Sequence, residues 1–547
     1  MDARLLIIIS YLCITLIIGM IFRKQAKKSR VEFFLAGRNL SKILLFFTMA
    51  ATNFSAFTIF GFSGAGYRMG YAFYPVMGFG TAFMAISFSM IGGKILTLSK
   101  AHGYITPSDF VFHRYNSSVL KKLFSLVMIV FTLPYIALQA IASGKSLNSF
   151  IGIPYLSGAA LVSVFIIAYV ALGGMRSIAW TDFMQGVMMI GFTIAAFVLI
   201  ASKSGGFSHV HGEIAQRTPE LFSRPGSGGS MGYGIWFGYM FLWFFADPMF
   251  PQLFQRFMAA RDEETLQSTV VLYPIITTFL FFLTVSIGVM GRFAFPDLPT
   301  AQSDAIFPLL LGRYANPILG TLLLTGSLAA LMSTMDSQLL TLTSMVTEDF
   351  FIIKKKEILK EKLVIIGLGI AGILIAVKPP QTILDFINRT TFYGLSVLAP
   401  TVIGGLYWKR ANKYGALTSI LIGEGMVVAY YFNLIKTPGI LPVIPIMGAT
   451  GGTFILISLL TVSEDENREI VFSIKKEAMR WIPVFVILFA MGHDFWAWNR
   501  RPVIVGGLPL WVLYFFGLGI LLSFSFWVYL NKAGKWEHQT GSTWTKA

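Results

Sequence analysis

The sequence predicts an all-α integral membrane protein in which many helices cross the bilayer. Hydrophobic residues make up 55% of the 547 residues and charged residues only 13%, whereas soluble domains carry about 25% charged residues. Apolar runs long enough to span a bilayer as a helix recur along the whole chain, and we count about fifteen of them. They lie near residues 4–22, 41–67, 70–98, 120–143, 156–173, 183–202, 234–257, 269–292, 316–345, 361–378, 386–408, 415–433, 442–462, 481–495 and 507–530.

Composition and motifs exclude several classes of protein. The single cysteine, Cys13, rules out an intramolecular disulfide and a cysteine-based zinc site. The six histidines are scattered except for His209 and His211, so a histidine metal centre is not expected. No nucleophile–base pairing or metal-ligand spacing predicts an enzyme. The chain has no P-loop motif, which argues against an ATP-driven pump with its own motor.

The charge pattern predicts how the chain lies in the membrane. A net charge of +17 would suggest a nucleic-acid partner in a soluble protein. Here the basic residues fall in loops, and cytoplasmic loops of membrane proteins are rich in Lys and Arg. With the N-terminus outside, the 43 Lys and Arg divide into about 30 inside and about 13 outside. We therefore expect an inner (plasma) membrane protein with a cytoplasmic C-terminus and no nucleic-acid or obligate protein partner.

The run at 316–345 contains the most informative polar cluster. Within one helical turn it carries Ser333, Thr334, Asp336 and Ser337. Polar groups in hydrocarbon are costly, so these side chains should face protein, water or an ion. Hydroxyl, carbonyl and carboxylate oxygens suit a small hard cation. The alternative is that the hydroxyls only join helices, as most membrane Ser and Thr do.

Two runs are interrupted. The run at 41–67 contains Ala51-Thr-Asn-Phe-Ser-Ala-Phe-Thr58, followed by Gly61, Gly64 and Gly66. This pattern predicts unwound backbone whose carbonyls coordinate an ion, or, alternatively, close helix packing through small residues. The run at 234–257 carries two interior prolines, which predict a broken or strongly bent helix.

The two interruptions lie five spans apart, and five is an odd number, so the second half has the opposite orientation. Matching interruptions in two such halves are typical of inverted-repeat transporters, whose binding site lies near the bilayer midplane. The predicted organisation is an N-terminal extra helix and basic inner loop at 1–40, a first repeat at 41–202, an outer loop at 203–233, a second repeat at 234–408, and extra helices with a cytoplasmic tail at 409–547.

Three further polar residues lie in or beside spans. Gln139 is a mid-membrane amide that needs a partner. Asp182 follows a predicted inner turn and can cap the next helix, contribute to a cation path, or do both. Glu424 is an isolated carboxylate, for which a structural role at a helix end and a proton site are both open.

From about residue 30 to 410 the sequence resembles the sodium:solute symporter family. The most specific segment lies in the polar run at 316–345 and just after it. The residues that carry the resemblance are Phe33-Phe-Leu-Ala-Gly-Arg38, Gly61 to Gly66, Pro134-Tyr-Ile-Ala-Leu-Gln139, Trp180-Thr-Asp182, Gln252-x-x-Gln-Arg256, Met332-Ser-Thr-x-Asp-Ser-Gln-Leu-Leu340 and Thr347-Glu-Asp349.

The resemblance implies a LeuT-type fold with two inverted five-helix repeats, one extra helix before them and about four after them. It also implies a sodium site made by carbonyls at the first break and by a carbonyl and two hydroxyls on the eighth core helix. Some members bind a second sodium, and here Asp336 stands where those members have serine, so a second sodium or a proton remains open. The first site falls on Ala51, Phe54, Ala330, Ser333 and Thr334, and the second on Asp182, Ser333, Asp336 and Ser337.

The resemblance also narrows the solute. Sugar-transporting members have Glu and Gln at positions that align with Met77 and Thr58 here, and hydroxyl-rich ligands need such partners. The sequence is closer to the pantothenate and monocarboxylate members, so a small organic acid is expected. The residues predicted to line the pocket are Asn53, Ser55, Thr58, Tyr74, Gln139, Trp236 and Tyr239.

The function expected from these observations is sodium-coupled symport of a small solute by alternating access, with sodium as the only cofactor. The alternatives are a transporter-like membrane solute sensor, a proton-coupled symporter of the same fold, and a channel. The absence of a kinase signature argues against the sensor, and the absence of a repeated pore loop argues against the channel.

Overall fold

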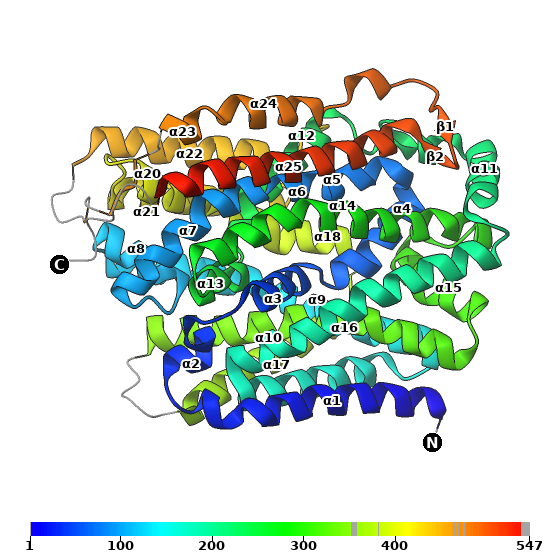
Figure 1. Ribbon diagram of the computed structural model, residues 1–547, viewed down its shortest axis with the longest axis horizontal. Coiled ribbons are helices and arrows are strands. Elements are labelled where there is room, and N and C mark those ends of the chain that lie inside the picture. The colour runs from blue at the N-terminus through cyan, green and yellow to red at the C-terminus, as the bar shows by residue number, and fades with distance from the viewer. Residues whose placement is uncertain are drawn as a thin grey trace.

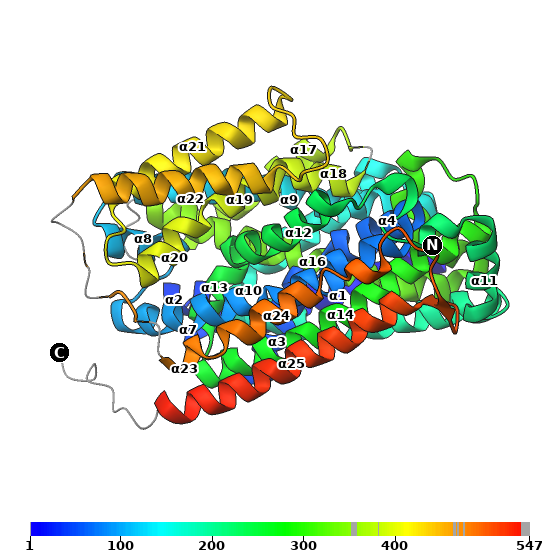
Figure 2. The ribbon, with the colours of Figure 1, turned by 90° about the horizontal axis from the view of Figure 1, so that it is seen from above.

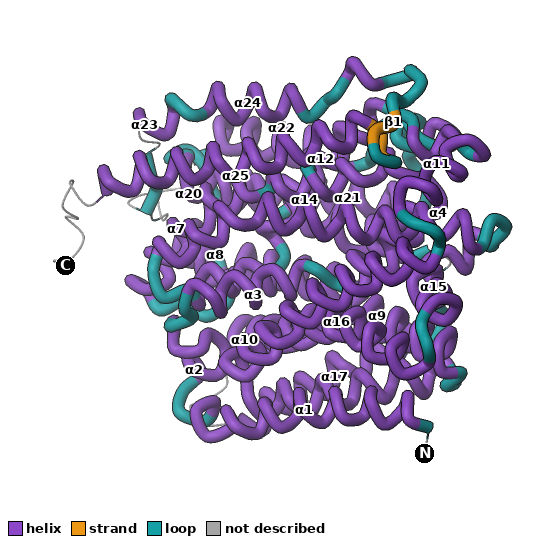
Figure 3. The backbone as a smooth tube through the Cα atoms, turned by 45° about the vertical axis from the view of Figure 1, so that its right-hand side comes forward, coloured by secondary structure: helices purple, strands orange, loops and turns teal. Residues whose placement is uncertain are grey.

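The computed structural model describes residues 2–351, 358–380, 382–462, 467, 470–473 and 476–537. Within these residues the regular structure is helical except for one short antiparallel hairpin. Figure 1 shows the long helices running side by side along one direction, and Figure 3 shows how little of the backbone is loop or strand. The hairpin pairs β1 (Ile504–Val505) with β2 (Leu508–Pro509).

Eight helical stretches of the described residues are long and apolar enough to cross a membrane. The number is smaller than the predicted count of runs because some runs join into one helix and others are divided into short helices. The eight stretches are Ala3–Ala26, Phe57–His102, Ser118–Ile151, Tyr155–Lys203, Glu263–Ala294, Pro317–Phe350, Val443–Leu460 and Leu510–Lys532.

The helices of the first half begin and end at residues suited to those positions. The Ser117 hydroxyl accepts the Leu120 amide at the start of α9, and Gly152 ends this helix with a φ of 83°. The helices are α1 (Ala3–Ala26), α2 (Arg30–Leu35), α3 (Lys42–Asn53), α4 (Phe62–Met69), α5 (Tyr74–Gly78), α6 (Gly80–Phe83), α7 (Ala85–His102), α8 (Pro107–Tyr115), α9 (Ser118–Ile151), α10 (Tyr155–Lys203) and α11 (Phe207–Arg217).

The later helices show the same signals. Asp262 caps α14 by accepting the Thr265 amide at 2.9 Å. The helices are α12 (Tyr233–Ala246), α13 (Pro251–Ala259), α14 (Glu263–Ala294), α15 (Ile306–Tyr314), α16 (Pro317–Met345), α17 (Ile358–Ala376), α18 (Ile383–Ile387), α19 (Tyr393–Val397), α20 (Ala399–Tyr407), α21 (Lys413–Tyr431), α22 (Val443–Leu460), α23 (Lys476–Met479), α24 (Ile482–Met491) and α25 (Leu510–Glu537).

Short tight or wide helical turns link these helices. They are η1 (Ala36–Arg38), η2 (Phe57–Gly61), η3 (Gly70–Phe73), η4 (Pro219–Phe222), η5 (Ser227–Gly229), η6 (Asp247–Met249), η7 (Thr300–Ala305), η8 (Val346–Phe350), η9 (Asn388–Phe392) and η10 (Phe495–Ala497).

Helix α16 lies in the middle of the molecule. Every residue from Leu323 to Met345 is buried. Burial on all faces is typical of a helix that is surrounded by protein. It packs against α10, α9 and α3. Figure 2 shows α16 between α21 and α22 at one edge and α25 at the opposite edge. The polar turn at residues 333–337 therefore faces protein and not lipid.

Two predicted segments differ from the structure. The stretch 203–233, predicted as a loop, contains α11, whose apolar side buries Val210, His211 and Ile214. The predicted inner turn before Asp182 is a kink at Gly174 (φ 59°, ψ −161°), which divides α10 into two helical segments. Asp182 lies eight residues beyond the kink, so it is not the residue that caps the second segment.

The glycines after the first interruption serve helix packing. A Cβ on Gly66 would lie 2.4 Å from the Val285 carbonyl oxygen of α14, and a Cβ on Gly64 would lie 2.2 Å from an Asp304 carboxylate oxygen. Both glycines lie inside the regular helix α4. The alternative interpretation, close approach of helices through small residues, is therefore correct for these two positions.

Candidate functional site

The first interrupted helix breaks where the sequence predicted it. Helix α3 ends at Asn53, and Phe54 leaves the helical conformation with φ −84° and ψ 89°. Helical backbone resumes at Phe57 with the turn η2 and continues into α4. Because no helical turn follows directly, the last carbonyl groups of α3 receive no hydrogen bonds from backbone amides of a next turn. They are therefore available to other partners.

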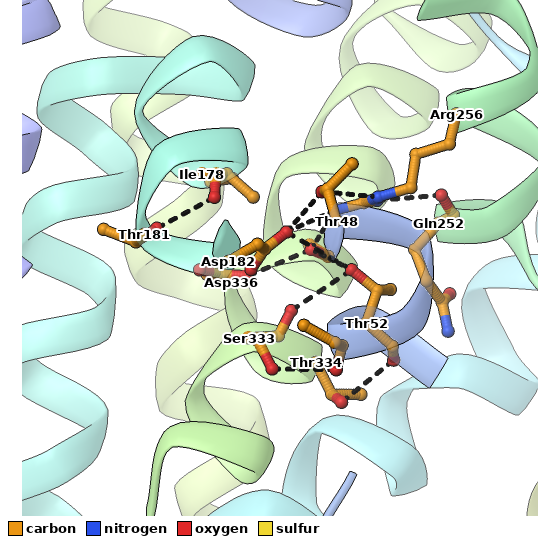
Figure 4. Close-up of polar contacts among 12 residues, drawn as sticks. Thr48, Thr52, Ile178, Thr181, Asp182, Gln252, Arg256, Ser333, Thr334 and Asp336 are labelled. Atoms are coloured by element: carbon orange, nitrogen blue, oxygen red, sulfur yellow. Dashed lines mark hydrogen bonds and ion pairs between the residues drawn. The ribbon is translucent and has the colours of Figure 1, made fainter. Parts of the chain in front are cut away.

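Hydroxyls of α16 reach these carbonyls. Ser333 Oγ donates to the Ala51 carbonyl oxygen at 2.8 Å and lies 3.0 Å from the Ala330 carbonyl oxygen. Thr334 Oγ1 lies 2.9 Å from the Thr52 carbonyl oxygen and 3.2 Å from that of Ala330. All five residues are buried. Figure 4 shows these side chains directed at the end of α3.

This arrangement collects three carbonyl and two hydroxyl oxygens between a broken helix and the central helix. Such neutral hard oxygen donors fit a sodium ion in a buried site. Four of the five predicted ligands, all except Phe54, share these contacts. The Phe54 amide donates to the Ala50 carbonyl at 2.8 Å, and Phe54 itself lies at the break. The Thr52 carbonyl is an additional oxygen that the sequence did not indicate.

A second polar cluster lies next to the first. Arg256, on α13, donates to Asp182 at 3.0 Å and to Ser337 at 2.5 Å. Its Nε donates to Thr48 at 2.9 Å, and the Thr48 hydroxyl donates to the Asp182 carboxylate. Thr52 Oγ1 lies 3.0 Å from Ser337 Oγ. A guanidinium thus neutralises Asp182 and contacts two of the residues predicted for a second cation.

Asp336 belongs to the same cluster but has different partners. Its Oδ2 accepts a hydrogen bond of 2.6 Å from Tyr169, and its Oδ1 accepts one of 3.0 Å from Ser337. Asp336, Asp182 and Arg256 are all completely buried. Figure 4 shows Asp182 and Asp336 beside Thr48 and Thr52 of α3. The structure therefore brings together every residue predicted for the second site and adds Arg256.

The second interrupted helix also breaks as predicted. Helix α12 ends at Ala246, the turn η6 follows, and Phe250 (φ −62°, ψ 120°) is extended before Pro251 begins α13. Pro at the first helical position has a backbone angle suited to a helix start and lacks an amide hydrogen that would be unsatisfied there. Both interruptions lie in buried segments.

Three residues predicted for the pocket lie at the first break. Asn53 Nδ2 donates to the Tyr273 hydroxyl at 2.6 Å, and Ser55 Oγ lies 3.0 Å from the Tyr135 hydroxyl. Gln139 Oε1 accepts the amide of Ala56 at 3.1 Å, which gives this amide side chain its partner. Tyr135 and Tyr273 were not predicted, because nothing in the spacing along α9 and α14 distinguishes a pocket tyrosine from a packing one.

The other four predicted pocket residues are more dispersed. Thr58 is buried and its hydroxyl has no hydrogen-bond partner in the described structure. Tyr239 accepts a hydrogen bond of 2.8 Å from Asn388. Tyr74 and Trp236 pack against aromatic rings of the C-terminal helix α25, with ring centroids 5.8 Å and 6.1 Å apart.

Comparisons with known proteins place the chain in a family. The model of the "Sodium:solute symporter family" matches residues 33–423. The chain is 28% identical over 406 residues to the sodium/pantothenate symporter of Haemophilus influenzae, covering 73% of this chain and 83% of that protein. It is 27% identical over 440 residues to a sodium/proline symporter of Staphylococcus aureus, covering 77% and 84%.

A solved structure matches the fold. The structure of a Na+-coupled sialic acid symporter in a substrate-bound outward-open state superimposes with a TM-score of 0.71 and 20% identity, covering 85% of this chain and 99% of that one. The chain belongs to the sodium:solute symporter family and has the LeuT-type fold. It is an integral membrane transporter, a sodium-coupled solute symporter and not an enzyme.

Proposed function

We propose that this chain imports a small organic acid together with sodium by alternating access. The observation that carries the sodium site is the set of hydroxyl-to-carbonyl contacts between α16 and the broken end of α3. We assign sodium to the oxygens of Ala51, Phe54, Ala330, Ser333 and Thr334, joined by the Thr52 carbonyl. Sodium bound there holds α3 against α16, and its release inward frees the two helices to move relative to one another.

The organic-acid assignment rests on relatives and on the break itself. Pantothenate and proline, named for two relatives, are both carboxylic acids. Helical backbone restarts at Phe57 after the first break. The N-terminal end of a helical segment carries partial positive charge, which favours a carboxylate nearby. Met77 and Thr58 stand at the positions where sugar-transporting members of the family have Glu and Gln, so this chain lacks the polar pair expected to bind a sugar.

We further propose that one sodium ion binds in each cycle. The Arg256 guanidinium already contacts Asp182 and Ser337, so a second cation at these residues would meet a positive charge. We propose that the two repeats comprise residues 41–202 and 234–408 and that the protein lies in the inner membrane. The sodium site then lies between the two repeats.

The sodium site can be tested without knowing the solute. Sodium should raise the melting temperature of the purified wild-type protein, because a ligand that binds only the folded state stabilises it. In Ser333→Ala and in Thr334→Ala, the sodium concentration that gives half of this effect should rise about tenfold or more, since each loses an oxygen that contacts the ion. Uptake of labelled proline and pantothenate into proteoliposomes should show the same shift where either is transported.

Thr343→Ala is the matched control. Thr343 lies on the same helix, and its hydroxyl donates only to the Leu339 carbonyl of that helix, at 2.7 Å. Sodium dependence should stay at the wild-type value in this variant. Unchanged sodium dependence in both site variants would show that the ion binds elsewhere.

A further inference from the structure

Asp247 differs from the other buried carboxylates beside the two breaks in what surrounds its oxygens. It is the first residue after α12, at the break of the second interrupted helix, and is only 1% exposed. Neither carboxylate oxygen meets the geometry of a hydrogen bond with a described residue, although the Asn53 side chain is near it, and no described Lys or Arg forms an ion pair with it. Its role is not explained by the sodium site or by the cluster around Arg256.

The other buried aspartates of the described residues each have a partner within the chain: three pair with arginines, Asp349 lies 3.2 Å from Lys121, and Asp336 accepts hydrogen bonds from Tyr169 and Ser337. Asp182 lies 3.0 Å from Arg256, Asp494 lies 2.7 Å from Arg224, and Asp304 lies 3.1 Å from Arg68. Burial of an ionised carboxylate without a partner costs several kcal/mol or more, which explains why the chain provides a cation or hydrogen-bond donors in each case. For Asp247 the described chain provides no cation, and a bound ligand can supply one.

Asp247 lies near the polar residues of the first break. Asn53 is next to it and donates to the Tyr273 hydroxyl at 2.6 Å, and Tyr135 bonds to Ser55 at 3.0 Å. Three residues after Asp247, the ring of Phe250 contacts that of Tyr135, with centroids 5.8 Å apart. Two interrupted helices therefore contribute to one polar region, with amide and hydroxyl groups from one side and a carboxylate from the other.

We infer that Asp247 binds a positively charged nitrogen of the transported solute. This inference rests on the proposed function, in which the solute is an organic acid. A simple organic anion would be repelled by a buried carboxylate in the same region. An acid that also carries an ammonium group resolves the conflict. Its carboxylate lies at the start of the helical segment after the first break, and its ammonium pairs with Asp247 at the second. The solute class is thus narrowed from organic acids to zwitterionic amino acids.

The test compares matched pairs of solutes that differ only in the amino nitrogen. Binding to the purified full-length protein in sodium is measured for a panel of amino acids and their nitrogen-free counterparts, such as proline with cyclopentanecarboxylate and leucine with 4-methylpentanoate. The wild type should bind at least one amino acid and reject its counterpart. Asp247→Asn should weaken that binding more than about thirtyfold, whereas Asp247→Glu, which keeps the charge, should lose much less.

Glu424→Gln is the control. Glu424 is another carboxylate in a membrane helix whose oxygens have no partner, but it lies on α21, which the sequence places outside the two repeats. Its neutralisation should leave solute affinity unchanged. If Asp247→Asn does not fold, the wild-type solute pairs and Asp247→Glu still decide the matter.

Three results would overturn the inference. One is binding of a nitrogen-free acid as tight in Asp247→Asn as in the wild type. Another is a change in sodium affinity without a change in solute selectivity, which would make sodium the partner of Asp247. The third is proton-coupled uptake that needs no solute ammonium. The proposed function fails separately: binding that requires the ammonium and Asp247 but not sodium would remove sodium coupling and leave this inference standing.

Discussion

At the scale of single residues, the Arg256–Asp182 pair shows how this protein manages buried charge. Both side chains are completely buried, and the guanidinium is held by the hydroxyls of Thr48 and Ser337 and by the Gln252 carbonyl at 2.9 Å. Removing one member of such a pair leaves the other as an uncompensated charge. The pair therefore ties α13 to α10 and α3 through electrostatics as well as packing.

We expect Arg256→Gln to lower the free energy of unfolding by about 3–5 kcal/mol, because Asp182 is left buried without a cation. The double variant with Asp182→Asn should recover much of the loss. Melting temperatures in detergent measure both effects. As a control, Arg217→Gln removes an exposed pair with Glu213 and should change stability little. Additive losses in the double variant would contradict direct pairing.

His211 provides a pH-dependent contribution to stability outside the membrane spans. It is buried on α11, its Nδ1 lies 2.9 Å from the Phe207 carbonyl oxygen, and its Nε2 lies 2.8 Å from the Tyr71 hydroxyl. Burial lowers the pKa of His211 to about 4. The unfolded chain, with a pKa near 6.5, therefore binds more protons than the folded one between these values, and stability falls as the pH drops below about 6.5.

Between pH 7.5 and pH 5.0 this group should reduce the free energy of unfolding by about 2 kcal/mol. His211→Gln has no proton to gain in this range, so its melting temperature should fall less over the same interval. Melting curves of both proteins at the two pH values make the comparison. Equal losses would show that other groups cause the acid sensitivity.

At the scale of elements, the half-helix α4 depends on close contact with α14. A Cβ on Gly288 would lie 2.0 Å from the Ser63 carbonyl oxygen, which is backbone and cannot rotate away. The Ser63 hydroxyl donates to the Thr284 carbonyl at 3.1 Å and joins the same two helices. The position of the segment that follows the first break is thus set by a glycine on a different helix.

Gly288→Ala should therefore destabilise the protein by about 1–3 kcal/mol or more, since overpacking forces the two helices apart. It should also weaken sodium-dependent stabilisation, because α4 continues from the break that carries the sodium oxygens. Gly191→Ala is the control: the added Cβ on α10 meets nothing within 4 Å, so stability should hold or rise slightly. A melting-temperature comparison of the two variants, with and without sodium, tests this.

At the scale of the whole molecule, the two ends of the described chain lie at opposite ends of the bundle. Figure 1 shows α1 beginning at the right and α25 ending at the left. Termini on opposite sides of the membrane are part of the orientation expected from the charge pattern, with the N-terminus outside and the C-terminus cytoplasmic. Cys13 is the single cysteine, so a cysteine-free background needs only Cys13→Ser.

In that background, Asp2→Cys should react with a membrane-impermeant maleimide in intact cells. Asn531→Cys, at the other end of the described chain, should react only after the membrane is opened. The physical reason is the excess of Lys and Arg in the loops assigned to the inside. The reverse pattern of labelling would invert the whole topology.

The sequence by itself determined the class of fold, both helix breaks and the hydroxyl cluster, and its resemblance to a known family indicated the candidate sodium ligands. Interior prolines and a polar stretch in an apolar run mark a break locally, because they remove or compete for helix hydrogen bonds. The hydroxyl turn on α16 was equally visible, since hydroxyls and a carboxylate within one turn of a membrane helix are costly unless they are used. These signals depend on neighbours in sequence.

Only the tertiary structure decided which distant residues meet. Arg256 is 74 residues from Asp182, and Tyr273 is 220 from Asn53, so no local pattern could pair them. The same applies to Asp247, whose lack of a partner is a property of the helices around it and not of its own segment. Periodicity and composition report where a chain is buried, whereas charge compensation depends on which buried segments are brought into contact.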